Sequence, residues 1–516
     1  MRTNDEPRST VAESTLNANP GCRAWRFDRI LIGDDWQRDV EVRVDGRGRI
    51  AGVTTGVEEV RGETVTGWAV PGVPNVHSHS FQRALAGLAE GPGPDSFWSW
   101  REVMYSFLAR LTPDDVEAIT AQLYVELLKA GLTCVGEFHY LHHPPGGGVY
   151  DDPAEMSRRV LAGARTAGIR LVHLPAVYES GGFGGRPLAR GQERFGMDLE
   201  GVARLHELLR SEARDPCVSL GWALHSLRAV SPGSFRQVAG LLAGSAGDGI
   251  APVHVHVAEQ RREVRECIAD RGARPVEWLL DHAPVDERWC LIHATHATGA
   301  ELAGVAQRGA VVGLCPTTEA NLGDGLFPLR AFTAGGGGFG IGTDSHVSRS
   351  PVEELRLLDY GQRLRSESRA ALGDAGEKGD SAPGSESTGG AARSGAGGAL
   401  SGAEGALSSA EGALSGAGGA LLRHVWRGGS RALAADCGSI ERGMQADLVV
   451  LDADHPALVG RLGPAVLDSW IFSGTDNPVR DVMVGGDWVV RDGRHSREDT
   501  VGRAYARTVR GLAAGG

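Results

Sequence analysis

Lysine is almost missing from this sequence of 516 residues. Of its 53 lysine and arginine residues, only Lys129 and Lys378 are lysines. The formal net charge of −12 at pH 7 disfavours the clustered basic surface that neutralises phosphates, so we expect no nucleic-acid partner. Long apolar runs are also lacking. No stretch approaches the roughly 20 residues of a membrane-spanning helix, and we expect no membrane association.

Cysteine is sparse: the seven cysteines are spread from Cys22 to Cys437, and no two of them form a CxxC motif. This distribution excludes a disulfide framework and a zinc ribbon, and it fits a reducing compartment. The first residues also lack the apolar core of a signal peptide. Since 41% apolar and 23% charged residues are typical of a globular chain, the sequence predicts a folded cytoplasmic protein.

Glycine is in excess, and part of the excess is local. The segment 373–420 holds 15 glycines but no aromatic residue, valine or isoleucine, and it contains a repeat of seven residues. A heptad can indicate a coiled coil, but one leucine per repeat buries too little surface to offset the entropy of ordering. We predict a disordered insertion there.

The rest of the chain predicts an α/β protein with a small β domain. Alternating polar and apolar residues separated by glycine turns indicate short strands near both ends of the chain, and the two ends plausibly pair. Between them, apolar strand-like runs alternate with helical patterns about eight times, which favours a (β/α)8 TIM-like barrel. We predict a flexible tail at 1–21, a β-sandwich part at 22–70, the barrel at 71–372 and 421–437 around the insertion, and a second sandwich part with a C-terminal tail at 438–516.

One helix has a complete sequence signature. Thr112 is a suitable N-cap, Pro113 a suitable first residue, and Gly131 a suitable terminator. Apolar residues between them recur at helical spacing: Val116, Ile119, Leu123 and Leu127.

Histidines and acidic residues follow several of the predicted strands. His77 and His79 are two residues apart after the first strand, so both side chains point to the same side. The fifth strand carries His254 and His256, and Asp344 follows the eighth. Because the carboxyl ends of all barrel strands meet on one face, two histidines from the first strand, one from the fifth and Asp344 can form an N/O set suited to Zn²⁺ with one position left for water.

These residues resemble the amidohydrolase superfamily. The resemblance rests on His77-Ser78-His79, on His256 with Glu259, and on His293 and Asp344, and the terminal β segments resemble its accessory sandwich. The strings Pro74 to Leu88 and Phe97 to Arg101 resemble a branch that removes ammonia from a linear formimino group. The resemblance implies a small-molecule substrate with two carboxylates, hydrolysis of its C=N bond, and a possible homodimer.

The resemblance also implies roles for individual residues. His77, His79, His256 and Asp344 would hold one divalent ion, most simply Zn²⁺, which makes water nucleophilic near neutral pH. Asp344 and His293 would take a proton from that water, and Glu259 would pass one to the leaving nitrogen. A second metal ion usually needs a bridging carboxylated lysine, and neither lysine is suitably placed: Lys378 lies in the insertion, and Lys129 falls on a solvent-facing flank.

Other histidines compete for these roles. His254 shares a strand face with His256; the resemblance implies that His256 is the ligand and that His254 is a buried or supporting histidine. His139, His142 and His143 adjoin a stretch rich in proline and glycine, which favours solvated loop histidines.

The residues that would recognise the substrate are less clearly marked. Planar guanidinium groups bind carboxylates in a bidentate manner, and Arg228 and Arg101 are our candidate clamps. Gln82, Tyr140 and His225 are candidate hydrogen-bonding partners. Two other functions remain open at this point: a zinc aminohydrolase that acts on a purine or another heterocycle, and a non-catalytic barrel scaffold. The joint presence of Glu259, His293 and Asp344 speaks against the scaffold, which needs none of them.

Overall fold

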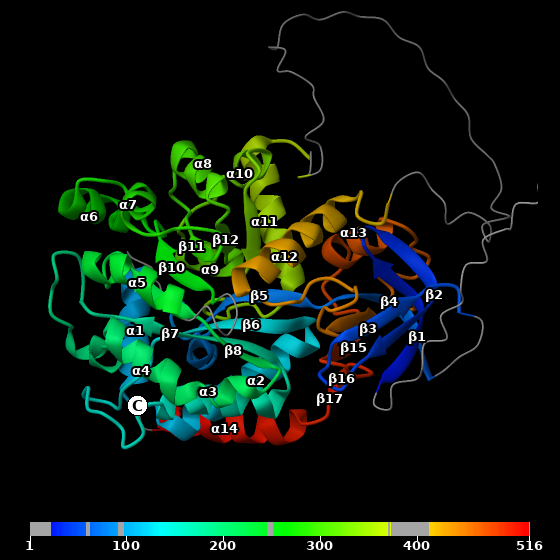
Figure 1. Ribbon diagram of the computed structural model, residues 1–516, viewed down its shortest axis with the longest axis horizontal. Helices are drawn as coiled ribbons and strands as arrows, with labels where there is room; N and C mark the ends of the chain where they lie inside the picture. The colour runs from blue at the N-terminus through cyan, green and yellow to red at the C-terminus, as the bar shows by residue number, and fades with distance from the viewer. Residues whose placement is uncertain are drawn as a thin grey trace, which may run out of the picture.

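The computed structural model describes residues 22–57, 62–90, 97–244, 251–369, 372 and 412–514. The predicted tail at 1–21 and residues 373–411 of the predicted insertion lie outside the described residues. Within them the chain forms a barrel and a β domain that lie side by side (Figure 1). The predicted α/β class, with a (β/α)8 barrel and a β domain built from both ends of the chain, is confirmed.

The barrel is a closed parallel sheet. Its strands pair in the order β6-β5-β13-β12-β11-β10-β9-β7, and the pairing of β6 with β7 closes the ring. A short strand, β8 (Val218–Leu220), precedes β9 in the chain and pairs with the first part of β7, whereas β9 pairs with its last part. The ring strands are β5 (Val73–Ser78), β6 (Leu132–His139), β7 (Arg170–Val177), β9 (Trp222–Ser226), β10 (Val253–Val257), β11 (Trp289–His293), β12 (Val311–Leu314) and β13 (Gly338–Ile341).

Helices surround the ring and share its apolar core. The best-marked of them is α2, where Thr112 and Asp115 form a reciprocal capping box and the predicted apolar face is buried. The described helices of the barrel part are η1 (Ser80–Leu85), α1 (Phe97–Leu108), α2 (Pro113–Lys129), α3 (Glu155–Ala167), η2 (Arg190–Phe195), α4 (Leu199–Leu209), η3 (Glu212–Arg214), α5 (Pro232–Gly244), α6 (Arg261–Arg271), α7 (Pro275–His282), α8 (Gly299–Gln307), α9 (Pro316–Leu322), α10 (Leu329–Ala334), α11 (Pro351–Ser366) and α12 (Ala417–Leu433).

The β domain is one mixed sheet with a core of its own. Its strands, which the sequence suggested as a sandwich, pair continuously in the order β17-β16-β15-β14-β4-β1-β2-β3, so that β4 and β14 join the two ends of the chain. A buried ion pair between Arg170 of β7 and Asp447 (2.8 Å) ties the barrel to this domain. The strands are β1 (Arg23–Ile32), β2 (Asp35–Val44), β3 (Ile50–Thr54), β4 (Glu63–Pro71), β14 (Leu448–Leu451), β15 (Val479–Val484), β16 (Asp487–Arg491) and β17 (Arg494–His495).

Two segments differ from the sequence-based expectation. Part of the predicted insertion is folded: among its described residues, Ala413 and Leu414 are buried and α12 begins at Ala417. The end of the chain is also not a tail: Glu498–Ala514 form helix α14, which packs along α2 (Figure 1). A further helix, α13 (Ala465–Phe472), packs against α11 and α12.

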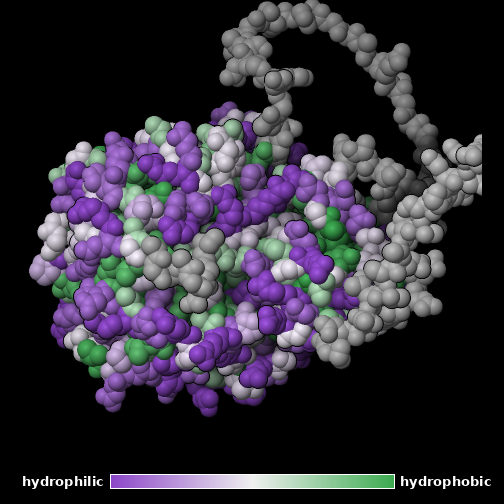
Figure 2. Space-filling view, in the orientation of Figure 1, coloured by the Kyte–Doolittle hydropathy of each residue, from purple (hydrophilic) through white to green (hydrophobic). Residues whose placement is uncertain are grey.

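The surface is predominantly polar on the face shown in Figure 2, where apolar residues appear only in scattered patches. Among the described helices, none is both long enough and apolar enough to cross a membrane.

Candidate metal centre and active site

Two histidines from the first barrel strand open the site. His77 lies on β5 and His79 directly after it, and their ring centroids are 4.6 Å apart. Nδ1 of His79 donates to the carbonyl oxygen of Phe138 (2.8 Å) on β6. Since a carbonyl can only accept, Nδ1 carries the hydrogen and Nε2 keeps its lone pair. The hydrogen bond therefore prepares His79 to bind a metal through Nε2.

His256 at the end of β10 is prepared in the same way. Its Nδ1 donates to the carbonyl oxygen of His225 (2.8 Å), which leaves Nε2 as the acceptor. That Nε2 lies 3.0 Å from Nε2 of His77. The ligand atoms of His77, His79 and His256 all lie within 4.8 Å of one another, so the three imidazoles can share one ion.

Asp344 completes the cluster from the loop after β13. Its Oδ1 lies 3.4 Å from Nε2 of His77 and 3.3 Å from Nε2 of His79. The chain can approach this closely because Gly342 precedes it: a Cβ there would lie 2.7 Å from Cβ of His77. Three imidazole nitrogens and one carboxylate oxygen thus converge at the ends of β5, β10 and β13, which are far apart in the sequence.

The electrostatics favour the metal-binding form of the imidazoles. Burial, and then the neighbouring imidazoles, lower the pKa of His77 and of His256 well below the usual value for histidine. Burial also lowers the pKa of His79, against the opposing effect of Asp344. All three rings are therefore neutral near pH 7 and offer lone pairs. A buried set of three neutral nitrogens and a carboxylate fits Zn²⁺ well.

Strained backbone is concentrated at this site. Nine described residues other than glycine have a positive φ, and five of them lie at the ends of β10, β11 and β13. Such conformations cost about 1–3 kcal/mol each and persist where the surrounding structure fixes them. The five are Ala258 (φ 51°), His293 (68°), Ala294 (47°), Asp344 (43°) and His346 (62°).

His293 at the end of β11 lies among acidic side chains. Its Nε2 is 3.8 Å from Glu259 and 3.8 Å from Asp344, while its Nδ1 is 3.1 Å from Glu319 of α9. Burial alone would lower the pKa of His293, but the three carboxylates outweigh it and raise the pKa to about 10. Burial raises the pKa of Glu259, which places a protonatable carboxyl beside the cluster.

A second group of potential ligands, His293, Cys315 and Glu319, adjoins the first. Its members already satisfy one another, because Oε1 of Glu319 accepts from Nδ1 of His293 and from the backbone N–H of Cys315 (2.9 Å). This carboxylate fixes which nitrogen of His293 faces the site. Glu319 was not predicted from the sequence.

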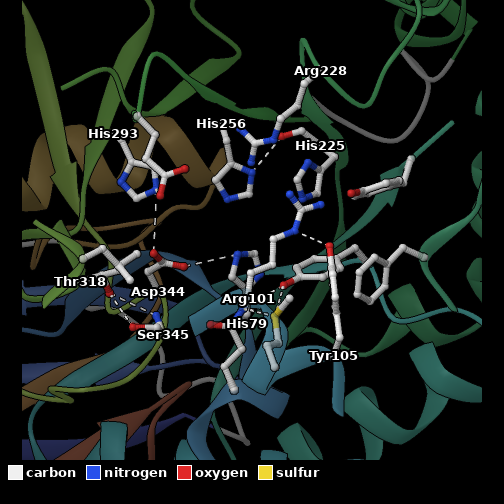
Figure 3. A pocket seen from close by; sticks show the side chains of 17 residues that line it. His79, Arg101, Tyr105, His225, Arg228, His256, His293, Thr318, Asp344 and Ser345 are labelled. Atoms are coloured by element: carbon white, nitrogen blue, oxygen red, sulfur yellow. Dashed lines mark hydrogen bonds and ion pairs between the residues drawn. The ribbon is translucent and has the colours of Figure 1, made fainter. Parts of the chain in front are cut away.

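A pocket opens over the cluster, and all the candidate substrate-binding residues line it (Figure 3). Nε2 of Gln82 donates to the hydroxyl oxygen of Tyr140 (2.8 Å), and Nε of Arg101 donates to that of Tyr105. His225 lies near the end of β9, and Arg228 lies in the loop that follows this strand. The pocket thus places two guanidinium groups beside the imidazole cluster.

The competing histidines lie elsewhere. Nε2 of His254 donates to the carbonyl oxygen of Ala432 in α12 (2.7 Å), one layer below His256. The prediction of solvated loop histidines is wrong for His139 and His142, which are buried, while His143 is half-buried. Later segments of the chain hold this stretch: Nε2 of His142 donates to the carbonyl oxygen of Ala176 (2.9 Å), and the backbone N–H groups of His142 and His143 donate to the carbonyl oxygen of Arg194 in η2.

Lys129, the lysine that the structure describes, does not line the pocket. Lys129 is partly exposed at the end of α2 and pairs with Glu498 of α14 (2.7 Å), so it meets a helix rather than open solvent. Lys378 lies outside the described residues.

Several pocket residues escaped sequence reasoning. Tyr105 lies one helical turn after Arg101, and Ser345 follows Asp344, so their positions alone offered a signal. Thr318 follows β12, where the end of a barrel strand also marks a pocket position. The full set that was missed is Met104, Tyr105, Tyr178, Phe195, Thr318, Leu322 and Ser345.

Comparisons with known proteins agree with this geometry. The model of the amidohydrolase family matches residues 68–376. The chain is 46% identical to the formimidoylglutamate deiminase of Pseudomonas aeruginosa over 484 residues, which cover 93% of this chain and 98% of that protein. Among solved structures, an amidohydrolase from Brucella melitensis superposes with a TM-score of 0.82 at 42% identity, over 95% of this chain and 100% of that one.

A more distant structure shares the fold. An adenosine deaminase from Xanthomonas campestris with bound zinc superposes with a TM-score of 0.73 at 23% identity, over 95% of this chain and 97% of that one.

Proposed function

The chain belongs to the amidohydrolase family, and on that premise we propose that it hydrolyses N-formimidoyl-L-glutamate to N-formyl-L-glutamate and ammonia, a step of histidine degradation. The observation that carries the proposal is the pocket, in which two arginines lie beside a cluster of neutral imidazoles. Its support from sequence is the 46% identity to a formimidoylglutamate deiminase along almost the whole chain.

We propose one metal ion per chain, Zn²⁺, held by His77, His79, His256 and Asp344. The fixed Nδ1 hydrogens of His79 and His256 support this set, since they leave Nε2 free to coordinate. Zn²⁺ bound there supplies the Lewis acidity that makes water nucleophilic near neutral pH. A single ion is favoured because Lys129 pairs with Glu498 at the end of α2, away from the residues that line the pocket, and so is not placed to supply a bridging carboxylate.

Side chains of the protein would carry out the proton transfers. Water adds to the formimino carbon, and one of its protons passes to Asp344, with His293 beside it at 3.8 Å. The Glu259 carboxyl, whose pKa is raised by burial, delivers a proton to the imino nitrogen. The proton held by Asp344 would then pass to this amino nitrogen, so that the C–N bond breaks and ammonia leaves. The remaining hydroxyl proton would return to Glu259 as the carbonyl of the formyl group forms. Glu319 holds His293 in one orientation throughout.

Substrate recognition would rest on charge. The two carboxylates of the substrate match Arg228 and Arg101, each of which can form paired hydrogen bonds with a carboxylate. Gln82, Tyr140 and His225 line the same pocket and would hydrogen-bond the formimino group and the glutamate backbone. The pocket is consistent with an acyclic anion, which a purine is not.

The test is ammonia release by purified, metal-analysed protein from formimidoylglutamate, with adenosine and guanine as comparison substrates. We expect turnover of formimidoylglutamate and none of the purines. A preference for a purine would establish the heterocycle aminohydrolase instead, and no turnover of any of them by metal-loaded protein would favour the scaffold. The homodimer and the cytoplasmic location are also proposals, the first tested by the mass of the purified protein in solution.

A further inference from the structure

Glu263 is a buried acid that the proposed mechanism does not use. It lies in the first turn of α6, and its side chain is only 2% exposed. It is not one of the residues that line the pocket. A carboxylate so far from water needs partners, and each of its partners belongs to the active site.

The first partner is the turn that follows the β10 ligand strand. Ala258 has φ 51°, a strained conformation for a residue other than glycine, and it joins His256 to Glu259. Oε1 of Glu263 accepts the backbone N–H of Ala258 (3.2 Å), and Oε2 accepts that of Glu259 (3.1 Å). The carboxylate thus holds the strained turn that aims Glu259 at the pocket.

The second partner is the arginine proposed to clamp the substrate. Oε2 of Glu263, the same oxygen that accepts the backbone N–H of Glu259, lies 3.5 Å from Nη1 of Arg228. Burial opposes the charge of Arg228, and Glu263 is the foremost of the acids that counter it and raise the arginine pKa. Without substrate, Glu263 therefore balances a cation that would otherwise lie uncompensated in the pocket wall.

We propose that Glu263 is a positioning residue that holds Arg228 and Glu259 in one fixed arrangement. Arg228, which binds a substrate carboxylate, and Glu259, which donates the proton, can then contact the same bound substrate molecule at the same time. The inference rests on the proposed function. It predicts that the effect of Glu263 on catalysis depends on Arg228. A residue that merely caps α6 would act independently of Arg228.

A double-mutant cycle tests this dependence with kcat and KM for formimidoylglutamate. Glu263→Gln removes the charge and one of the two acceptor oxygens. We expect kcat/KM to fall about 10- to 100-fold in the wild-type background, but only a few-fold in the Arg228→Met background, where the clamp is already absent. Glu266→Gln is the matched control: Glu266 is a partly exposed acid on the same helix that pairs with Arg262, and its substitution should leave both constants unchanged.

Loss of the same factor in both backgrounds would overturn the inference, as would Glu263→Gln kinetics equal to those of the wild type. If Glu263→Gln is not recovered in folded form, the same cycle is run with Glu263→Asp, which keeps the charge but shortens the reach to Arg228, with the same expectations for dependence. Wild-type protein is assayed first: if it releases no ammonia from formimidoylglutamate, the proposed function fails, whereas an active wild type with independent effects removes only the role of Glu263.

Discussion

Glu259→Gln separates chemistry from binding at this site. The substitution keeps the size of the side chain but removes its ability to give up a proton. The fold of the turn should survive, because Glu263 holds it through backbone N–H groups of Ala258 and Glu259 rather than through the Glu259 side chain. Arg228 also keeps its acidic neighbour Glu263. The pocket's capacity to bind a dianion is therefore retained.

The expected loss follows from the role proposed for the carboxyl. General acid catalysis by a positioned side chain contributes about 10²- to 10⁴-fold, so kcat should fall by about that factor. KM should change by no more than a few-fold, since the groups that bind carboxylates are intact. The assay is steady-state ammonia release from formimidoylglutamate, with metal content measured on the same samples.

Arg228→Met gives the opposite signature and serves as the comparison. It removes a charge-assisted bidentate contact of about 1.5–3 kcal/mol, so KM should rise about 10- to 100-fold while kcat falls less. Arg228→Lys should restore only part of the lost affinity for the substrate, because lysine lacks the planar guanidinium group that forms two parallel hydrogen bonds. Arg363→Met, which removes an arginine paired with Asp359 on α11, is the control. The assignment of Glu259 is refuted if Glu259→Gln retains kcat within about threefold, or if its loss appears in KM instead.

Three further predictions concern the metal, the domain contact and pH. His79→Ala should reduce bound zinc from about one ion per chain to a small fraction, as measured by elemental analysis; wild-type content near two per chain, or no loss in the variant, would contradict the single site. Asp447→Ala leaves Arg170 buried without its 2.8 Å partner and should lower the free energy of unfolding by about 3–5 kcal/mol in urea, and a loss under about 1 kcal/mol would show that the pair is dispensable. Burial raises the pKa of the Glu354 carboxyl to about 8, so the folded state holds this proton more tightly than the unfolded chain does. The stability that this difference contributes is fully present below about pH 4 and is lost as the pH rises through about 8. Glu354→Gln cannot ionise, so its melting temperature relative to wild type should be higher at pH 8.5 than at pH 5.5, and an equal difference at both pH values would rule out this titration.

Local signals in the sequence determined much of the fold. The capping residues Thr112 and Pro113 and the apolar spacing after them act within a few residues of one another, and α2 has the predicted face. The alternation of apolar runs with helical patterns predicted the barrel, since each strand and helix is specified by its own short stretch. The His77/His79 spacing likewise placed two imidazoles on one side of one strand end.

Contacts between distant segments decided what the sequence left open or got wrong. His142 is hydrogen-bonded to Ala176 of β7 and Arg194 of η2, and the His139 ring lies beside His173 of β7, so the composition of the loop after His139 was misleading. The resemblance already favoured His256 over His254 as the ligand, but the hydrogen-bond acceptors of the two rings, Ala432 for His254 and His225 for His256, belong to other elements and became known only from the structure.

Glu263 and Glu319 show the same division most clearly. Each is one acidic residue among 65 in the sequence, and neither has a motif around it that marks a role. Glu319 became recognisable only when β11 and α9 brought it to 3.1 Å from His293, and Glu263 when the loop after β9 brought Arg228 to 3.5 Å. Secondary structure depends on neighbours along the chain, whereas the charge state and orientation of a buried group depend on which groups replace its water, and only the tertiary structure decides that.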